Sequence, residues 1–206
     1  MSELVSVNVS MVQTRTHDGK AVETGIDKRP IAGRLALRGV NLAGDDQADR
    51  RVHGGPDRVA YAYAAEDYRW FEAELGRALA PGSFGENLTT HGLDVSGARI
   101  GERWSIGTAV LEVTSPRVPC FKLGMKLGDP AIVKTFARAL RPGAYLRIVT
   151  EGEIGAGDPI SILSRPTHDL TVAAMANILL FEHDRARELL VADLPEKWRV
   201  WVDERA

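Results

Sequence analysis

Short apolar runs that end at glycine or aspartate turns fill most of the chain between residues 3 and 163. Several of them alternate apolar and polar positions, as the run from Leu4 to Val9 does, and this period is typical of strands that bury one face. Many short strands at this spacing indicate a closed or partly closed β-barrel. We predict strands at residues 4–12, 22–26, 33–38, 57–63, 85–89, 102–106, 108–114, 144–150 and 159–163.

Two segments inside this region have helical rather than strand periodicity. Residues 64–75 carry aromatic and aliphatic side chains at helical spacing and are followed by Gly76, which favours a helix end. Residues 129–140 begin with Asp129 as a candidate N-cap and Pro130 in the first turn. We expect both helices to pack over the barrel.

The composition changes near Pro166, after which glycine and proline become rare and Ala, Leu, Glu and Arg dominate. This part has helical patterns at residues 170–181, 184–191 and 195–204. The predicted fold class is therefore mainly β (α+β), with a barrel domain at 1–165 and a small three-helix appendage at 166–206. A bundle of ~40 residues is marginal alone, so we expect it to lean on the barrel or on another subunit and to lie outside the functional pocket.

Charge and cysteine content narrow the class of partner. The 26 Lys and Arg residues against 28 Asp and Glu give a net charge of -2, without the excess expected of a nucleic-acid or membrane-surface protein. No apolar stretch approaches the ~20 residues of a membrane span, and no signal peptide is evident. The single cysteine excludes an intrachain disulfide. We expect a cytoplasmic protein with a small-molecule partner, and a homodimer stays open.

The segment around Cys120 is the densest candidate site. Pro116 and Pro119 restrict its backbone, and Arg117 and Lys122 place positive charge on both sides of the thiol. Nearby cations favour thiolate over thiol, which is what a metal ligand or a nucleophile needs. A buried structural cysteine is the alternative that the local sequence leaves open.

Three weaker candidate clusters lie earlier in the chain. His53 precedes Gly54 and Gly55, so a titratable ring stands beside backbone N–H groups that phosphate or pterin oxygens could approach. Asn87 follows a glycine turn and can both donate to and accept from a heterocycle edge. Lys28 begins a basic pair that can neutralise a phosphate. Each cluster is equally compatible with ordinary loop or surface structure.

The sequence lacks the motifs that several other classes of site require. The histidines lack the spacing of an HExxH motif, and one cysteine cannot build a zinc finger. The chain has no dinucleotide fingerprint after a strand, no P-loop and no GxSxG elbow. A hydrolase-type couple of Cys120 with His53 remains an alternative, because residues distant in sequence can be close in space.

Taken in order, the clusters resemble the MOSC family, and most closely its YiiM-like branch. The resemblance covers nearly the whole chain, including the helical tail. The matching strings are Lys28-x-Pro30, Gly44-Asp45-Asp46-Gln47-Ala48-Asp49, His53-Gly54-Gly55-Pro56-Asp57, Phe84-Gly85-Glu86-Asn87-Leu88-Thr89-Thr90, Ile100-Gly101-Glu102, Pro116-Arg117-x-Pro119-Cys120-x-Lys122-Leu123 and Gly157-Asp158.

This resemblance implies a β-barrel that binds the molybdenum cofactor, whose metal is held by the dithiolene of a phosphorylated pterin, with Cys120 as the protein ligand. We assign Lys28 and Arg117 to the phosphate and Asn87 to the pterin. We assign His53 to the open side of the metal, and His53 and Cys120 are the candidate catalytic residues. The positions implied to line the cofactor pocket are Lys28, Gln47, His53, Gly54, Gly55, Asn87, Arg117 and Lys122.

The same branch implies an oxidoreductase that reduces N-hydroxylated bases and related compounds from N-OH to N-H, with electrons from a separate flavin reductase. A protein of another class is also compatible with these motifs. It would be a carrier that holds cofactor or persulfide on Cys120 for another enzyme. The segment 154–157 and the length of the tail depart from the family pattern, a difference that would affect partner docking rather than the pocket.

Overall fold

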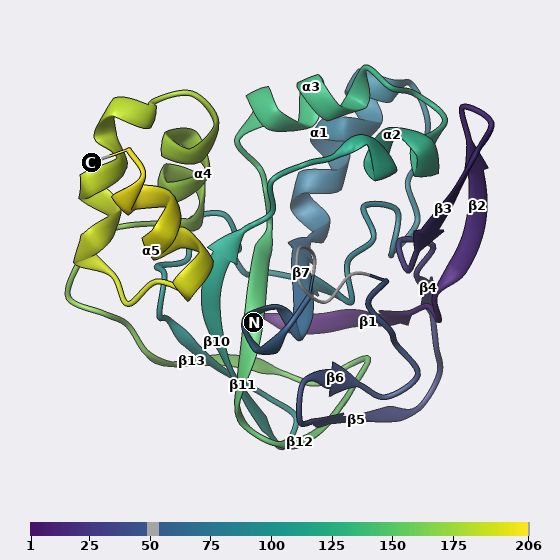
Figure 1. Ribbon diagram of the computed structural model, residues 1–206. Helices are drawn as coiled ribbons and strands as arrows, with labels where there is room; N and C mark the ends of the chain where they lie inside the picture. Colours follow the sequence, from purple (N-terminus) through teal and green to yellow (C-terminus); the bar gives the residue numbers. More distant parts are fainter. Residues whose placement is uncertain (49–53, 206) are drawn as a thin grey trace.

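The computed structural model describes residues 1–48 and 54–205 and has a mixed α+β architecture, which confirms the predicted class (Figure 1). Its strands are β1 (Glu3–Val9), β2 (Gln13–His17), β3 (Lys20–Thr24), β4 (Arg29–Pro30), β5 (Arg34–Arg38), β6 (Asn41–Leu42), β7 (Ala60–Ala64), β8 (Leu88–His91), β9 (Arg103–Ile106), β10 (Ala109–Pro116), β11 (Ala144–Thr150), β12 (Gly152–Gly155) and β13 (Ile160–Ser164). Its helices are α1 (Ala65–Leu75), α2 (Phe121–Leu127), α3 (Ile132–Ala139), α4 (Val172–Leu180) and α5 (Glu196–Asp203), with 3₁₀ segments at Pro56–Arg58 and His183–Val191.

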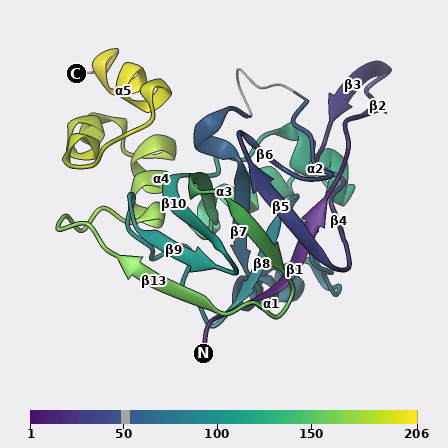
Figure 2. The same cartoon turned by 90° about the horizontal axis from the view of Figure 1, so that it is seen from below.

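Eight strands form one sheet in the order β13-β9-β10-β11-β7-β8-β1-β4, in which β7 and β8 are parallel. The sheet is not a closed barrel, because no ladder joins β1 to β13 among the described residues (Figure 2). A single bridge pairs Glu3 with Pro159, and the Leu4 N–H donates to the Asp158 carbonyl at 2.9 Å. The Gly157 N–H also donates to the Leu4 carbonyl at 2.7 Å and the Ile160 N–H to the Ser2 carbonyl at 2.8 Å, so the expected closure is limited to a few hydrogen bonds.

The sequence did not predict several of the elements, among them the short strands β4 and β6. The strand expected at 4–12 ends at Val9, and a separate hairpin of β2 and β3 follows, turning at Asp18 and Gly19 with φ of 49° and 74°. Strand β12 and helix α2 were also missed. Helix α2 begins directly after the extended backbone of Cys120 (φ -131°, ψ 173°), which a proline-rich segment does not suggest.

Two buried clusters fill the molecule. The larger lies against the sheet and includes Trp104 and Leu111. The smaller is aromatic and lies where α1, α2 and α3 cover the sheet (Figure 1). Its members are Tyr61, Tyr63, Tyr68, Phe71, Phe84, Leu123, Ile132 and Phe136.

The chain after Pro166 is helical where the structure describes it. The Thr171 hydroxyl caps α4 by accepting from the Ala174 N–H at 3.1 Å, and the middle segment is 3₁₀ rather than α-helical. Val172 and Met175 belong to the same buried cluster as the sheet, so these helices are packed onto the sheet. The domain boundary at 165/166 stays a prediction. No described helix is long and apolar enough to cross a bilayer.

Candidate functional site

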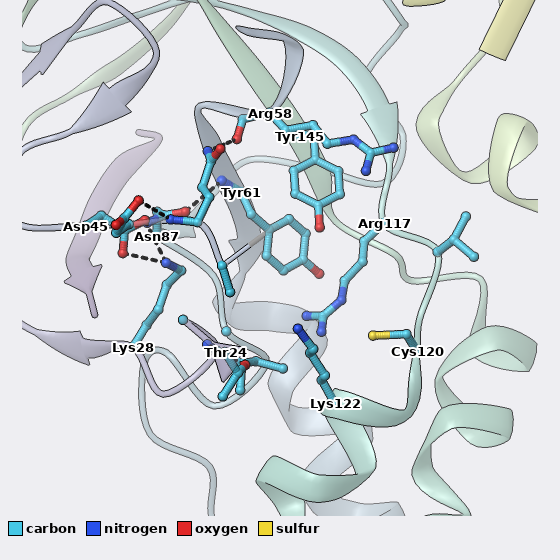
Figure 3. A pocket seen from close by; sticks show the side chains of 17 residues that line it. Thr24, Lys28, Asp45, Arg58, Tyr61, Asn87, Arg117, Cys120, Lys122 and Tyr145 are labelled. Atoms are coloured by element: carbon cyan, nitrogen blue, oxygen red, sulfur yellow. Dashed lines mark hydrogen bonds and ion pairs between the residues drawn. The ribbon is translucent and has the colours of Figure 1, made fainter. Parts of the chain in front are cut away.

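A pocket opens where segments far apart in the sequence meet beside the sheet (Figure 3). Its walls come from the chain after β3, the loop after β6, strand β7, the turn before β8, the segment between β10 and α2, and strand β11. Six residues predicted for the cofactor site lie in this lining, namely Lys28, Gln47, Asn87, Arg117, Cys120 and Lys122.

Lys28 has an acidic partner inside the protein. Its Nζ donates to both carboxylate oxygens of Asp45, at 2.5 and 2.7 Å, and the two side chains are only 9% and 4% exposed. Burial lowers the pKa of Lys28, and the adjacent Asp45 partly offsets that shift. Asp45 also accepts from the Ser10 N–H at 2.9 Å. The charge of Lys28 is therefore balanced within the chain, which its assignment to a phosphate did not anticipate.

The side-chain amide of Asn87 is likewise committed to the protein. Its Nδ2 donates to the Asn8 carbonyl at 3.2 Å and to Asp45 Oδ2 at 2.9 Å, while its Oδ1 accepts from the Tyr61 N–H at 3.1 Å. Both donor hydrogens and one acceptor position are thus in use. In this geometry Asn87 fixes the pocket wall, and a hydrogen bond to a pterin would have to compete with these contacts.

Gln47 ties the polar loop to the first turn before β7. Its Nε2 donates to the Arg58 carbonyl at 2.8 Å, and its Oε1 accepts from the Gly55 N–H at 3.0 Å. Gly55 has φ 94°, a conformation that favours glycine, and its N–H is not available to a ligand. Gly54 and Gly55 do not line the pocket among the described residues. His53 lies outside the described residues.

Glu86, which the sequence reasoning passed over in favour of its neighbour, is fully buried. Its carboxylate accepts hydrogen bonds from the Tyr68 hydroxyl, the Thr89 hydroxyl at 2.9 Å, and the backbone N–H groups of Gly82 and Phe84 at 2.5 and 3.1 Å. A buried carboxylate is tolerated only when its oxygens are satisfied in this way. Glu86 therefore holds the turn that carries the pocket floor.

Arg117 is 6% exposed and is held at several points. Its guanidinium donates to the Phe84 carbonyl and lies 5.2 Å from the Tyr61 ring centroid and 5.7 Å from that of Phe136. Burial acts to lower its pKa, but two tyrosines and Cys120 favour the charged form, and the pKa is raised. The geometry fixes a permanent cation at this end of the pocket.

Cys120 stands directly before α2 and is partly exposed. Its sulfur points toward the ends of Arg117 and Lys122, and all three lie on the same side of the pocket (Figure 3). Lys122 Nζ donates to the Glu23 carbonyl at 2.7 Å, which anchors α2 to the β2–β3 hairpin. This end of the pocket therefore combines one accessible thiol with two cations.

The aromatic wall of the pocket was not predicted. The rings of Tyr61 and Tyr145 have centroids 5.2 Å apart, and the guanidinium carbon of Arg58 lies 5.1 Å from the Tyr145 centroid. The signal for Tyr61 was present in the alternation of Ala and Tyr through β7, which puts Tyr61 and Tyr63 on one face. Tyr145 had no such signal, since its place depends on the pairing of β11 with β7.

The donor set limits what metal could bind. Among the described residues, no group of three or more His, Cys, Asp or Glu side chains is arranged to hold a metal ion. Cys120 is the only thiol in the chain. A metal bound through Cys120 would therefore have to bring most of its own ligands, as a metal in an organic cofactor does.

Comparison with known proteins identifies the family. The model of the MOSC domain matches residues 49–161. The uncharacterized protein YflK of Bacillus subtilis is 38% identical over 202 residues (95% of this chain, 90% of that protein), and the protein YiiM of Escherichia coli is 33% identical over 190 residues (88% and 84%). A protein of Gibberella moniliformis named reductase is 33% identical over 152 residues, covering 72% of this chain and 27% of that protein. The crystal structure of YiiM from Geobacillus stearothermophilus matches with a TM-score of 0.82 at 30% identity, over 100% of this chain and 99% of that one. The chain therefore belongs to the MOSC family, as a YiiM-like member.

Proposed function

We propose that this protein is an oxidoreductase that binds a molybdenum-pterin cofactor through Cys120 and reduces N-hydroxylated bases and related compounds. The observation that carries the proposal is the pocket end where the Cys120 thiol faces Arg117 and Lys122 (Figure 3). Membership of the MOSC family supports the cofactor, and the relative named reductase supports redox chemistry.

The residues present fit such a cofactor. A soft thiolate suits a sulfur-rich metal centre, and a dithiolene would supply ligands that the described protein residues do not. The charge of Arg117 suits an anionic phosphate, whereas Lys28 is already paired with Asp45. We therefore assign the anionic group to the Cys120 end of the pocket rather than to the Lys28 end.

The cofactor, when bound, would supply two-electron redox chemistry, and the chain's own groups would bind and orient the substrate. The rings of Tyr61 and Tyr145 offer planar apolar surface on which a heterocyclic base can stack. Reduction of N-OH to N-H takes up two electrons and two protons and releases water. The Lys122 ammonium, in the pocket lining, is the group we assign to hydrogen-bond the departing oxygen.

Electrons would come from a separate flavin reductase. The region similar to this chain makes up 27% of the Gibberella protein named reductase, so MOSC-like sequence also occurs inside a larger reductase. We propose that the present chain obtains its electrons from a separate partner protein, whereas a single longer chain could carry the electron donor as a part of itself. A small substrate and this donor are the only partners that the proposal requires.

The decisive experiment measures turnover by the cofactor-loaded protein. The purified holoprotein is given a reduced viologen dye with 6-N-hydroxylaminopurine or benzamidoxime, and the products are followed by chromatography. We expect release of the reduced base, together with molybdenum and pterin fluorescence in stoichiometric amounts. A carrier or sulfur-transfer module would exchange cofactor with an acceptor enzyme without turnover, and that result would refute the proposal.

A further inference from the structure

The aromatic wall of the pocket continues into the C-terminal helices as an alternating stack of rings and cations. The guanidinium carbon of Arg58 lies 5.1 Å from the Tyr145 ring centroid and 5.8 Å from that of Trp198. Tyr145 contacts Tyr61 at 5.2 Å between centroids, and the guanidinium of Arg117 lies 5.2 Å from the Tyr61 ring. The stack therefore runs from α5 to the cation beside Cys120.

Trp198 lies on α5 and is only 5% exposed. Its indole N–H has no hydrogen-bond partner among the described residues, so its contacts are made by the ring. Lys197 lies 5.0 Å from the same ring, and its pKa is lowered by burial and by the nearby charge of Arg58. The cations of Arg58 and Lys197 therefore both lie near the Trp198 ring, which is part of neither the sheet nor the pocket lining.

A cation held between two ring faces gains attraction from both, and it keeps those rings apart at a fixed distance. A movement of Arg58 would alter its contacts with both Tyr145 and Trp198. The orientation of Tyr145 in the pocket is therefore fixed from outside by an element that the sequence placed away from the site.

We propose that Trp198 is a positioning residue of the pocket, which acts through Arg58 on Tyr145 and, beyond it, on Tyr61 and Arg117. The C-terminal helices are then a structural part of the site, although none of their residues lines it. The kinetic readout of this inference rests on the proposed function, whereas its chemical readout does not.

The chemical readout uses Cys120, the sole thiol, as a reporter in the cofactor-free protein. Arg117 is a cation beside the partly exposed Cys120 (Figure 3) and attracts an anionic reagent, so a displaced arginine should slow alkylation by iodoacetate. We expect Arg58→Met and Trp198→Leu to lower the rate about three- to ten-fold at fixed pH, in keeping with loss of a desolvated cation–π contact. Arg58→Lys, which keeps a cation, should restore part of the rate.

The matched control is Arg205, which follows α5 and contacts a ring on that helix. Arg205 places its guanidinium 4.3 Å from the Trp201 ring, a contact of the same kind that does not reach the pocket. Arg205→Met should alkylate at the wild-type rate. Because Trp198 acts through Arg58, the double variant should be no slower than Arg58→Met alone. An unchanged or faster rate in Arg58→Met, or an equal loss in Arg205→Met, overturns the proposal.

The kinetic readout separates positioning from general damage. In the loaded protein, Arg58→Met should raise KM for an aromatic substrate several-fold and leave kcat near wild type, since the wall binds substrate and carries no electron. A fall in kcat at unchanged KM overturns the inference. If wild-type protein shows no turnover, the proposed function fails and the alkylation rates alone decide the role of Trp198. If Trp198→Leu fails to fold, the Arg58 variants give the same test.

Discussion

The two ends of the pocket both carry a cation and differ in how completely their polar groups are satisfied. At one end, Lys28, Asp45 and Asn87 bind one another, and their hydrogen-bonding groups are largely used within the protein. At the other, Arg117 and Cys120 face the pocket, and the thiol has no acidic or metal-binding cluster around it among the described residues. We call the first the closed end, because its network of hydrogen bonds holds the pocket in shape. We call the second the open end, because its groups are available to bind a ligand.

Motif membership alone does not distinguish these roles. Lys28, Asn87 and Arg117 all stand in strings shared with the family, yet only the arginine keeps a charge without an acidic partner among the described contacts. The cause is the loop after β6, which brings Asp45 against Lys28 and removes that lysine from the set of ligand-binding cations. We use this contrast to rank the predictions that follow.

The largest effect should come from the open end, at Cys120. Cys120→Ser should abolish N-hydroxyl reduction, because the hydroxyl is a far poorer ligand for a soft metal centre than a thiolate. Folding should change little, since the side chain is partly exposed. Turnover, molybdenum content and thermal melting of the same preparation measure all three. Wild-type turnover with wild-type metal content in the serine variant would disprove the central role of the thiol.

At the closed end the same kind of change should cost stability instead. Asp45→Ala leaves Lys28 buried without its partner, and removal of one member of a buried pair costs about 3–5 kcal/mol. Urea denaturation of the cofactor-free protein measures it. Lys122→Met, at the open end, is the control and should cost no more than about 1.5 kcal/mol, since it loses one exposed hydrogen bond to the Glu23 carbonyl. Equal losses of stability in the two variants would contradict the difference that we draw between the two ends.

The sequence predicted the elements with strong periodicity and missed those fixed by tertiary contacts. Helix α1 and the strands β9 and β10 follow from spacing alone, and the motif around Cys120 located the open end. The partner of Lys28 could not be read from the chain, because Asp45 is only one of several acids in a polar loop. Tyr145 and Trp198 reach the site by strand pairing and helix packing, which leave no local signal.

A third variant tests how the open end holds its ligand. Arg117→Ala should weaken cofactor retention about ten- to a hundred-fold, because a charge-assisted hydrogen bond is worth about 1.5–3 kcal/mol. Arg117→Lys should recover only part of the loss, since it keeps the charge without the planar fork that stacks on Tyr61. Molybdenum retained after gel filtration gives the measurement. Full retention in the alanine variant would make Arg117 a structural residue, as Lys28 is at the other end.

The smallest effect concerns Lys126 on α2. Its Nζ donates to the carbonyls of Ile26 and Gly82 at 2.7 and 2.5 Å, and it lacks a carboxylate partner in direct contact among the described residues. Burial lowers its pKa to about 8, against the opposing attraction of Glu86. Unlike Lys28, it bears a charge that the fold only partly balances.

The sign of the pH effect follows from this lowered pKa. Between about pH 8 and the ordinary lysine pKa of 10.5, the unfolded chain binds more protons at Lys126 than the folded one, so the free energy of unfolding contributed by this group rises with pH. Below pH 8 both states are protonated, and the cost of burying the charge is constant. We therefore expect wild type to gain stability relative to Lys126→Met as the pH rises from 8 to 10, when both are unfolded in urea. Lys134→Met, an exposed change on α3, should show no such gain. If the difference in free energy of unfolding between wild type and Lys126→Met stayed constant across this range, the charge of Lys126 would be as fully balanced by the fold as that of Lys28.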